Sequence, residues 1–354
     1  MRVTRWRAGG APVRLLWGTL ATTTLAAACT DARPVLLVHS PLQVRGLEWM
    51  EERFEADWPN VDLRWIQVPP EETLRLLREG PAEEWPDVWW GAPSWVLARA
   101  AGEGRLAAAS PSWLDDAGVD VRDPARRWIG VLLDPLVIAF NRDTVSLGQA
   151  PRDWIDLLHP RWAGEVVVPD APGSVAGSVL VGAVVGRDVA KGRDGTGGLD
   201  WLRRLDATVA AYPADEGTVV QRLVRGQETL AVLRLSTAVQ AAEDDGRLAW
   251  RLAGSGAPVV LEGVALVAGT TAASEAEELV EWLGSPDVVG SVASRFHRLP
   301  ALPGGDDAAT PAALARARLD LRAWMTDADT LAAHLDEWID RWRAEVREAT
   351  PRVF

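Results

Sequence analysis

One segment of this 354-residue chain places backbone donors where a negatively charged group could bind. An apolar run at residues 165–169 leads into a turn that contains Gly173, and a helical stretch begins at Ser174. Free backbone N–H groups and the helix dipole attract anions at such a helix start. Ser174 could equally act only as the N-cap of the helix. The residues alone therefore leave two readings open for Gly173, Ser174 and Val175, an anion site or a capped helix.

The single cysteine, Cys29, follows a segment that is typical of an exported protein. Residues 1–14 are basic and contain no acidic residue, and residues 15–28 are uncharged and end in small side chains. This order is that of a secretory signal, and the apolar run is too short to span a bilayer. The end of the run resembles a bacterial lipobox, although Ala26 stands where that pattern prefers leucine. We therefore expect residues 1–28 to be a lipoprotein signal peptide and Cys29 to be lipidated; the alternative is a plain cleaved signal with an incidental cysteine.

Composition excludes several classes of partner and site. The formal net charge of -13 argues against nucleic acid and against an anionic membrane surface, because both attract basic proteins. One cysteine can form neither an intrachain disulfide nor a cysteine-based metal cluster. The sequence contains no G-x-S-x-G, no H-E-x-x-H and no glycine-rich P-loop, so no catalytic motif supports an enzyme.

Alternating strand and helix patterns are expected to position these residues. Apolar runs predict strands over 35–38, 61–68 and 87–91, and helical spacing predicts helices over 47–58, 71–79 and 95–104. Strands that alternate with helices predict a mostly parallel sheet covered by helices, an α/β fold.

The rest of the chain continues with the same kinds of element. We predict strands over 136–141, 165–169 and 230–233, and a strand pair or one bent strand over 259–267. Helices are predicted over 153–158, 174–185 and 274–283, with an amphipathic helical tail over 311–350. Glycines make residues 186–198 the most flexible-looking loop.

Several segments, taken in order, resemble one known family. They are Val38-His39-Ser40, Pro86-Asp87-Val88-Trp89-Trp90-Gly91, Leu136-Val137-Ile138-Ala139-Phe140-Asn141, the segment 151–165, Leu223-Val224-Arg225-Gly226 and Glu262-Gly263-Val264-Ala265-Leu266-Val267. The segment 151–165, PRDWIDLLHPRWAGE, is the most specific of them. Together they resemble the ferric-iron/polyamine/phosphonate branch of the bacterial extracellular solute-binding proteins of ABC transporters, which have the class II periplasmic binding-protein fold.

That resemblance implies two α/β lobes, each a mostly parallel sheet flanked by helices, with a ligand cleft between them. The first lobe would hold residues 34–133 plus 256–354, and the second lobe would hold residues 137–252. The ligand would sit at strand C-termini and helix N-termini.

The resemblance also implies which residues contact the ligand. Gly173, Ser174 and Val175 would contact an anionic ligand or a co-bound anion. Ser40 and Ser94 would end first-lobe strands at the cleft, and Arg234, Ser236 and Thr237 would follow a second-lobe strand. Arg234 could pair with a carboxylate or phosphonate. Ordinary turn chemistry is the alternative for each of these positions.

We expect no metal site and no other cofactor. Iron-binding members of the resembled family use two adjacent tyrosines, whereas this chain has one tyrosine, Tyr212, and has Ser236 and Thr237 where the pair would fall. His39 could lie near the cleft, but a lone histidine is more often structural. Three tryptophans, Trp89, Trp90 and Trp95, could line the pocket.

The sequence thus predicts a non-enzymatic, monomeric binding lipoprotein at the periplasmic or extracellular face of a membrane. It would capture a small anionic or anion-assisted solute and deliver it to a permease and an ATPase. A ligand-binding sensor of the same fold is the alternative, and an exported hydrolase is a more distant one. Neighbouring genes for a permease and an ATPase would separate the importer from the sensor.

Overall fold

Short apolar runs in the first third of the chain form three parallel strands, as the sequence predicts. These are β1 (Val35–Ser40), β2 (Asp62–Gln67) and β3 (Val88–Pro93). The helices α1 (Val44–Asp57), α2 (Pro70–Glu79) and α3 (Ser94–Gly102) follow these strands in turn. The structure is a computed structural model that describes residues 33–302 and 310–349, so the predicted signal peptide and Cys29 lie outside the described residues.

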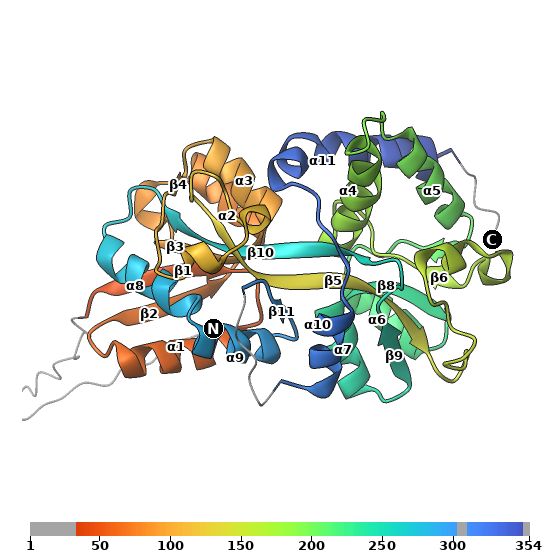
Figure 1. The fold of residues 1–354 in the computed structure, drawn as a ribbon, viewed down its shortest axis with the longest axis horizontal. Coiled ribbons are helices and arrows are strands. Elements are labelled where there is room, and N and C mark those ends of the chain that lie inside the picture. Colours follow the sequence, from red (N-terminus) through yellow and green to blue (C-terminus); the bar gives the residue numbers. More distant parts are fainter. Residues whose placement is uncertain (1–32, 303–309, 350–354) are drawn as a thin grey trace, which may run out of the picture. The chain divides into compact units, whose positions relative to one another are not determined.

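Two long antiparallel strands connect this part of the molecule to the second part (Figure 1). The strand β5 (Ile129–Asn141) pairs with β10 (Ala257–Val267) over its first half and with β8 (Leu230–Arg234) over its second half. The register of β10 shifts at Gly263 on both of its edges, so residues 259–267 form one bent strand rather than a strand pair.

Eight strands of the twelve-stranded sheet follow the order β2-β1-β3-β10-β5-β8-β6-β7, and the other four pair beside this path. In the second part, β6 (Val166–Val167) pairs with β8, β7 (Val209–Ala211) pairs with β6, and β9 (Leu248–Arg251) pairs with β5. The helices there are α4 (Val175–Val189), α5 (Thr196–Asp206), α6 (Glu216–Val224) and α7 (Leu235–Asp244). We call β1 to β3 with α1 to α3, α8 (Ala273–Leu283) and α9 (Pro286–Arg295) the first lobe, and β6 to β9 with α4 to α7 the second lobe.

Two predicted segments differ in part from the structure. Residues 186–198 are not one loop, because α4 runs to Val189 and α5 begins at Thr196. The tail is helical over most of its described residues, as predicted, but in separate pieces: α10 (Ala312–Asp320), the short strand β12 (Ala323–Trp324) and α11 (Ala328–Trp342) follow one another. A π-helical turn, Arg343–Arg347, continues α11.

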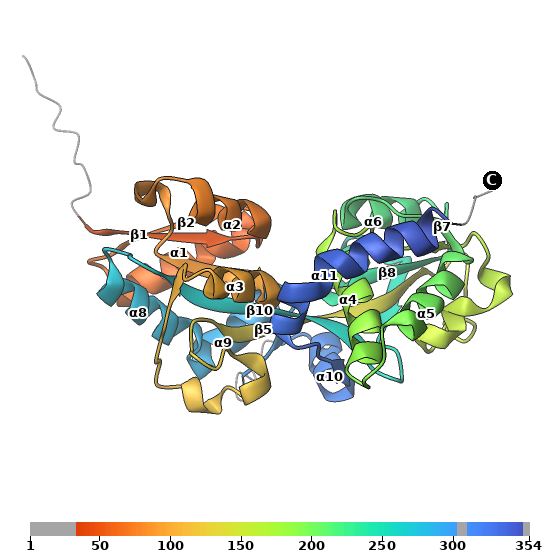
Figure 2. The ribbon, with the colours of Figure 1, turned by 90° about the horizontal axis from the view of Figure 1, so that it is seen from above.

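The helix α11 lies against helices of both lobes (Figure 2). Its side chains Leu331 and Leu335 approach Gly182 of α4, where a Cβ atom would come within 2.7 Å of Leu331 and 3.0 Å of Leu335. Toward the first lobe, Arg99 of α3 donates from Nε to the carbonyl oxygen of Ala332 (3.1 Å). The contact with α4 is thus apolar and close, while the contact with α3 includes polar groups.

The remaining short elements complete the fold. Two-residue strands are β4 (Leu106–Ala107) and β11 (Leu299–Pro300), and 3-10 turns are Ala82–Glu84, Leu114–Asp116, Val119–Val121, Trp154–Leu158 and Pro160–Trp162. The helix predicted over 153–158 is therefore a 3-10 turn, capped by Asp153. In the described part of the chain, no helix combines the length and apolar character needed to cross a membrane.

Candidate functional site

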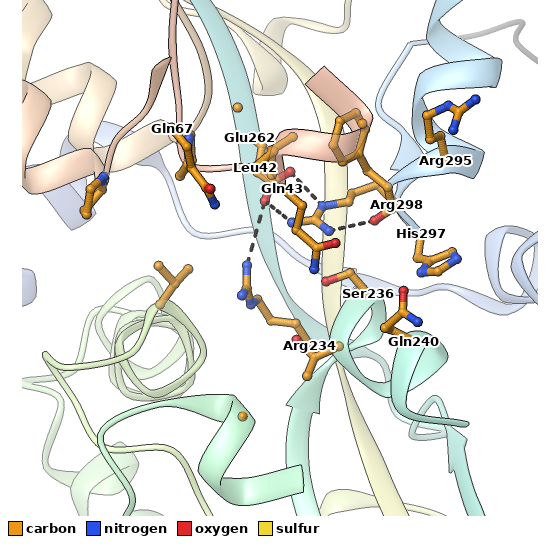
Figure 3. Close-up of a pocket in the computed structure, with 18 of the residues that line it drawn as sticks. Leu42, Gln43, Gln67, Arg234, Ser236, Gln240, Glu262, Arg295, His297 and Arg298 are labelled. Carbon is orange, nitrogen blue, oxygen red and sulfur yellow. Dashed lines mark hydrogen bonds and ion pairs between the residues drawn. The ribbon is translucent and has the colours of Figure 1, made fainter. Parts of the chain in front are cut away.

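A cavity of about 1090 Å³ lies between the first and the second lobe, beside β10 (Figure 3). Segments of the first lobe contribute Leu42, Gln67 and Pro93 at or just after strand ends. The second lobe contributes the start of α4, part of α6 and one side of α7. Strand ends and helix starts therefore meet at the cavity, which is the usual position of a ligand site in an open α/β sheet.

Four of the predicted site residues line this cavity. They are Val175, Arg234, Ser236 and Thr237. The arginine stands directly before α7, and the two hydroxyl residues lie in the first turn of that helix. All four residues belong to the second-lobe side of the cavity.

The other four predicted site residues are not among those that line the cavity. Ser40 and Ser94 are buried, and Ser40 Oγ accepts a hydrogen bond from the Leu42 backbone N–H (3.2 Å). Gly173 is exposed. Ser174 is buried and is the N-cap of α4, since its Oγ accepts from the Ala176 N–H (3.2 Å). Their neighbours Pro41, Pro93 and Val175 face the cavity in their place.

The tryptophans proposed for the pocket are core residues instead. Trp89, Trp90 and Trp95 are buried among apolar side chains and do not line the cavity. Hydrophobic burial, which is largest for aromatic rings, accounts for them.

His39 is also buried, and its Nδ1 lies 3.2 Å from Thr73 Oγ1. Burial lowers the pKa of His39 to about 4, so its imidazole is neutral at physiological pH.

Arg234 projects into the cavity from the second lobe and is held by one carboxylate. Glu216, the first residue of α6, accepts from the Arg234 backbone N–H (2.8 Å) and from its Nε (2.6 Å). Arg234 Nη1 lies 3.7 Å from Asp134 Oδ2 and 4.0 Å from Glu262 Oε1. The side chain of Arg234 keeps 23% of its surface exposed.

Asp134 anchors the start of α7 from the point where β5 passes between the lobes. Its Oδ1 accepts from the Ser236 backbone N–H (3.0 Å), and Oδ2 lies 2.6 Å from Ser236 Oγ. The carboxylate thus meets the positive end of the helix dipole, which stabilises negative charge. Ser236 is therefore occupied by this contact, although it lines the cavity.

Glu262 of β10 and Arg298 form the first-lobe side of the same ionic cluster. Arg298 donates from Nε (3.0 Å) and Nη2 (3.1 Å) to the two oxygens of Glu262, and from Nη1 to the Phe296 carbonyl oxygen (2.7 Å). Arg298 Nη2 also lies 3.5 Å from Asp134 Oδ2. All three nitrogens of the Arg298 guanidinium that could bind a ligand therefore already have partners.

The cluster's ionisation follows from its burial. Burial, with the neighbouring Asp134 carboxylate, raises the pKa of Glu262, although Arg298 opposes this shift. Burial alone would lower the pKa of Arg234, but Glu216, Asp134 and Glu262 outweigh it and raise that pKa. Both guanidiniums therefore stay charged. The two arginines differ in their outer nitrogens: within the cluster, those of Arg298 are hydrogen-bonded, whereas Nη1 and Nη2 of Arg234 form no hydrogen bond to a described residue.

Four glutamine side chains, which we call the rim, also line the cavity. They are Gln43 and Gln67 of the first lobe and Gln221 and Gln240 of the second lobe. Amides both donate and accept, so this rim suits a ligand with hydroxyl or carbonyl groups. A contact between the lobes also forms here, because His297 Nε2 lies 3.4 Å from Glu243 Oε2 on α7.

Sequence reasoning missed four charged residues of the cluster: Asp134, Glu216, Glu262 and Arg298. One signal could have found two of them, because Asp134 and Glu262 are the isolated acidic residues inside the apolar strands β5 and β10. Buried carboxylates require a partner. Within the described residues, no group of three or more His, Cys, Asp or Glu side chains is arranged to hold a metal ion.

Comparisons with known proteins agree with this architecture. The family described as bacterial extracellular solute-binding protein matches residues 86–325. A probable ABC transporter periplasmic-binding protein, y4fP of Sinorhizobium fredii, is 27% identical over 326 residues, which cover 92% of this chain and 90% of that protein.

Solved structures share the fold. Iron-bound HitA from Pseudomonas aeruginosa has a TM-score of 0.72 and 21% identity, covering 87% of this chain and 99% of that one. AfuA from Actinobacillus pleuropneumoniae, solved with fructose-6-phosphate, has a TM-score of 0.72 and 18% identity, covering 89% and 99%. The predicted two-lobed α/β fold of the periplasmic binding proteins is therefore confirmed.

Proposed function

The chain belongs to the bacterial extracellular solute-binding protein family, and from that premise we propose that it is the solute-capturing subunit of an ABC-type importer. The y4fP relative carries the name of such a subunit. A binding protein of this kind holds its solute between two lobes and passes it to a permease that an ATPase drives.

The observation that carries the proposal is the cavity between the lobes with Arg234 in its wall. Each lobe supplies part of the lining, so a ligand contacts both at once. Arg234 lines the cavity, and a guanidinium offers two parallel N–H donors to a carboxylate, phosphate or phosphonate. We propose that the solute carries such an anionic group and that the glutamines of the rim bind its remaining polar atoms.

A thermal-shift screen of the mature chain tests this function. The panel contains carboxylates, phosphates, phosphonates and sugar phosphates as anions, with sugars, polyamines and metal ions as the other classes. A solute that binds only the folded state raises the midpoint temperature. An anion that does so in the wild type and not in Arg234→Gln supports the proposal, whereas a response confined to neutral solutes, amines or metals contradicts it.

The start of α4 is the second contact that we propose for an anion, through Val175 and the residues before it. Ser174→Asp would keep an N-cap oxygen and so hold the stability of the helix, but it would place a fixed negative charge on the same N–H groups. We expect this variant to keep its midpoint temperature and to bind the anion found by the screen more weakly. Unchanged affinity would show that Ser174 only caps the helix.

We further propose that Cys29 carries a lipid that anchors the protein at the periplasmic or extracellular face of a membrane. The order of basic, apolar and small residues before the only cysteine supports this. Labelled fatty acid should enter the wild type and not Cys29→Ala. Equal labelling of both would contradict the anchor.

The importer and the sensor differ in the partner, not in the fold. We expect the ligand-bound protein to co-purify with an ABC-type permease and its ATPase and to stimulate that ATPase. A ligand-bound protein that leaves the ATPase unchanged but binds a membrane receptor would favour the sensor. We also predict that the protein does not bind ferric iron directly. A coloured iron complex with stoichiometric iron would contradict this prediction.

A further inference from the structure

Glu216 binds one residue with both of its oxygens. Oε1 accepts from the Arg234 backbone N–H (2.8 Å) and Oε2 accepts from Arg234 Nε (2.6 Å). The Glu216 residue is 8% exposed and does not line the cavity. A single buried carboxylate therefore fixes both the backbone of Arg234 and the inner edge of its guanidinium.

This clamp leaves only the outer edge of the guanidinium for a ligand. Nη1 is 3.7 Å from Asp134 and 4.0 Å from Glu262, which are ion-pair distances rather than hydrogen bonds. In Figure 3, the guanidinium of Arg234 points toward Glu262 across the cavity. Nε is already occupied, so Nη1 and Nη2 are the pair that can meet an oxyanion side by side.

We propose that Glu216 is a positioning residue for anion capture: it holds Arg234 so that the Nη1–Nη2 edge faces the cavity before a ligand arrives. This inference rests on the proposed function, in which Arg234 binds the anionic group of the solute. Arginine side chains lose considerable rotamer freedom when a ligand fixes them. A clamp that fixes the side chain beforehand removes that loss from the binding step.

The direction in which one substitution changes anion affinity separates a positioning role of Glu216 from a purely electrostatic one. Glu216→Gln removes a negative charge close to Arg234, so electrostatics alone would strengthen the binding of an anion. The same substitution replaces one acceptor oxygen by an N–H donor that faces the donors of Arg234, so the clamp loosens. Positioning therefore predicts weaker anion binding, which is the opposite change.

The experiment uses inorganic phosphate and sulfate as probes. Each is titrated by calorimetry into the wild type, Arg234→Gln, Glu216→Gln and the double variant. We expect Arg234→Gln to weaken binding about 10- to 100-fold and Glu216→Gln to weaken it about tenfold. The double variant should bind no more weakly than Arg234→Gln alone, because Glu216 acts through Arg234. A structural defect would instead add to the loss.

Glu228→Gln is the matched control. Glu228 is a buried carboxylate of the same lobe whose Oε2 accepts from Arg222 Nε (3.0 Å), and neither residue lines the cavity. The control should leave phosphate affinity within about twofold. An equal loss in Glu228→Gln and Glu216→Gln would show a general effect of breaking a buried ion pair and would overturn the inference.

A ligand-free measurement keeps the two proposals apart. In an ¹⁵N NMR spectrum, the Nε–H signal of Arg234, identified by its loss in Arg234→Lys, should exchange slowly in the wild type and rapidly in Glu216→Gln. Rapid exchange in the wild type overturns the positioning role. Slow exchange in a wild type that binds neither phosphate nor sulfate supports the clamp but contradicts the proposed anion capture. Unchanged or tighter anion binding by Glu216→Gln overturns the positioning role of Glu216 and leaves the proposed anion capture standing.

Discussion

The buried His39 makes a pH-dependent contribution to stability. Its pKa is lowered to about 4 in the folded protein, below the ordinary value of 6.5, because burial disfavours the charged ring. Unfolding therefore takes up a proton at this residue when the pH lies between these values. The stabilisation is complete above pH 6.5 and is lost as the pH falls toward 4, by about 2–4 kcal/mol in total.

The check is urea denaturation of the wild type and His39→Gln at several pH values. The wild type should lose more stability than the variant between pH 6.5 and pH 4. Because Gln cannot be protonated, the difference in unfolding free energy between the two proteins should narrow across this range. A constant difference would show that His39 does not titrate with a lowered pKa.

At the residue scale, the sequence pointed to residues at the cavity only where their neighbours along the chain show that a strand ends there. Arg234, Ser236 and Thr237 follow an apolar strand, and strand ends of an α/β sheet meet at its cleft. The partners of Arg234 could not be predicted in this way, because Asp134 is 100 positions away and Glu216 is 18 positions away. Ser40 and Ser94 do not line the cavity, whereas their neighbours along the chain, Pro41 and Pro93, do.

At the scale of elements, α11 packs against the second lobe through α4. Leu335 is 3% exposed and lies against Gly182 of α4. Leu335→Ala should lower the free energy of unfolding by about 2–5 kcal/mol, through lost burial and the cavity left behind. The matched control is Leu319→Ala on α10, where the side chain is 82% exposed and little change is expected. Chemical denaturation measures both, and equal effects would contradict this role of α11.

The elements that the sequence missed share a physical cause. The α4–α5 connection contains several glycines and looks like a loop, yet a Cβ atom at Gly198 would come within 2.8 Å of the Val185 Cα. That glycine permits two helices to pack closely, so tertiary contact outweighs low helix propensity. The tail over 311–350 has one apolar periodicity, but β12 interrupts it by pairing with β10, a contact that local sequence does not report.

At the scale of the whole molecule, the two long strands β5 and β10 run between the lobes (Figure 1). We expect hinging near Leu136 and Val259, because binding energy from both lobes becomes available only when both contact the solute. Small-angle scattering with and without a saturating solute should show a smaller radius of gyration for the complex. An unchanged radius at saturation would count against closure.

The most direct test of the account is calorimetric titration of the solute found by the screen into wild type and Arg234→Gln. The account predicts an anionic solute that binds the wild type with one-to-one stoichiometry and binds the variant about 10- to 100-fold more weakly, because a charge-assisted pair of hydrogen bonds is lost. Both proteins should have the same stoichiometry, which shows that the variant remains folded and competent. Equal affinities for wild type and variant would contradict the claim that this cavity captures its solute through Arg234.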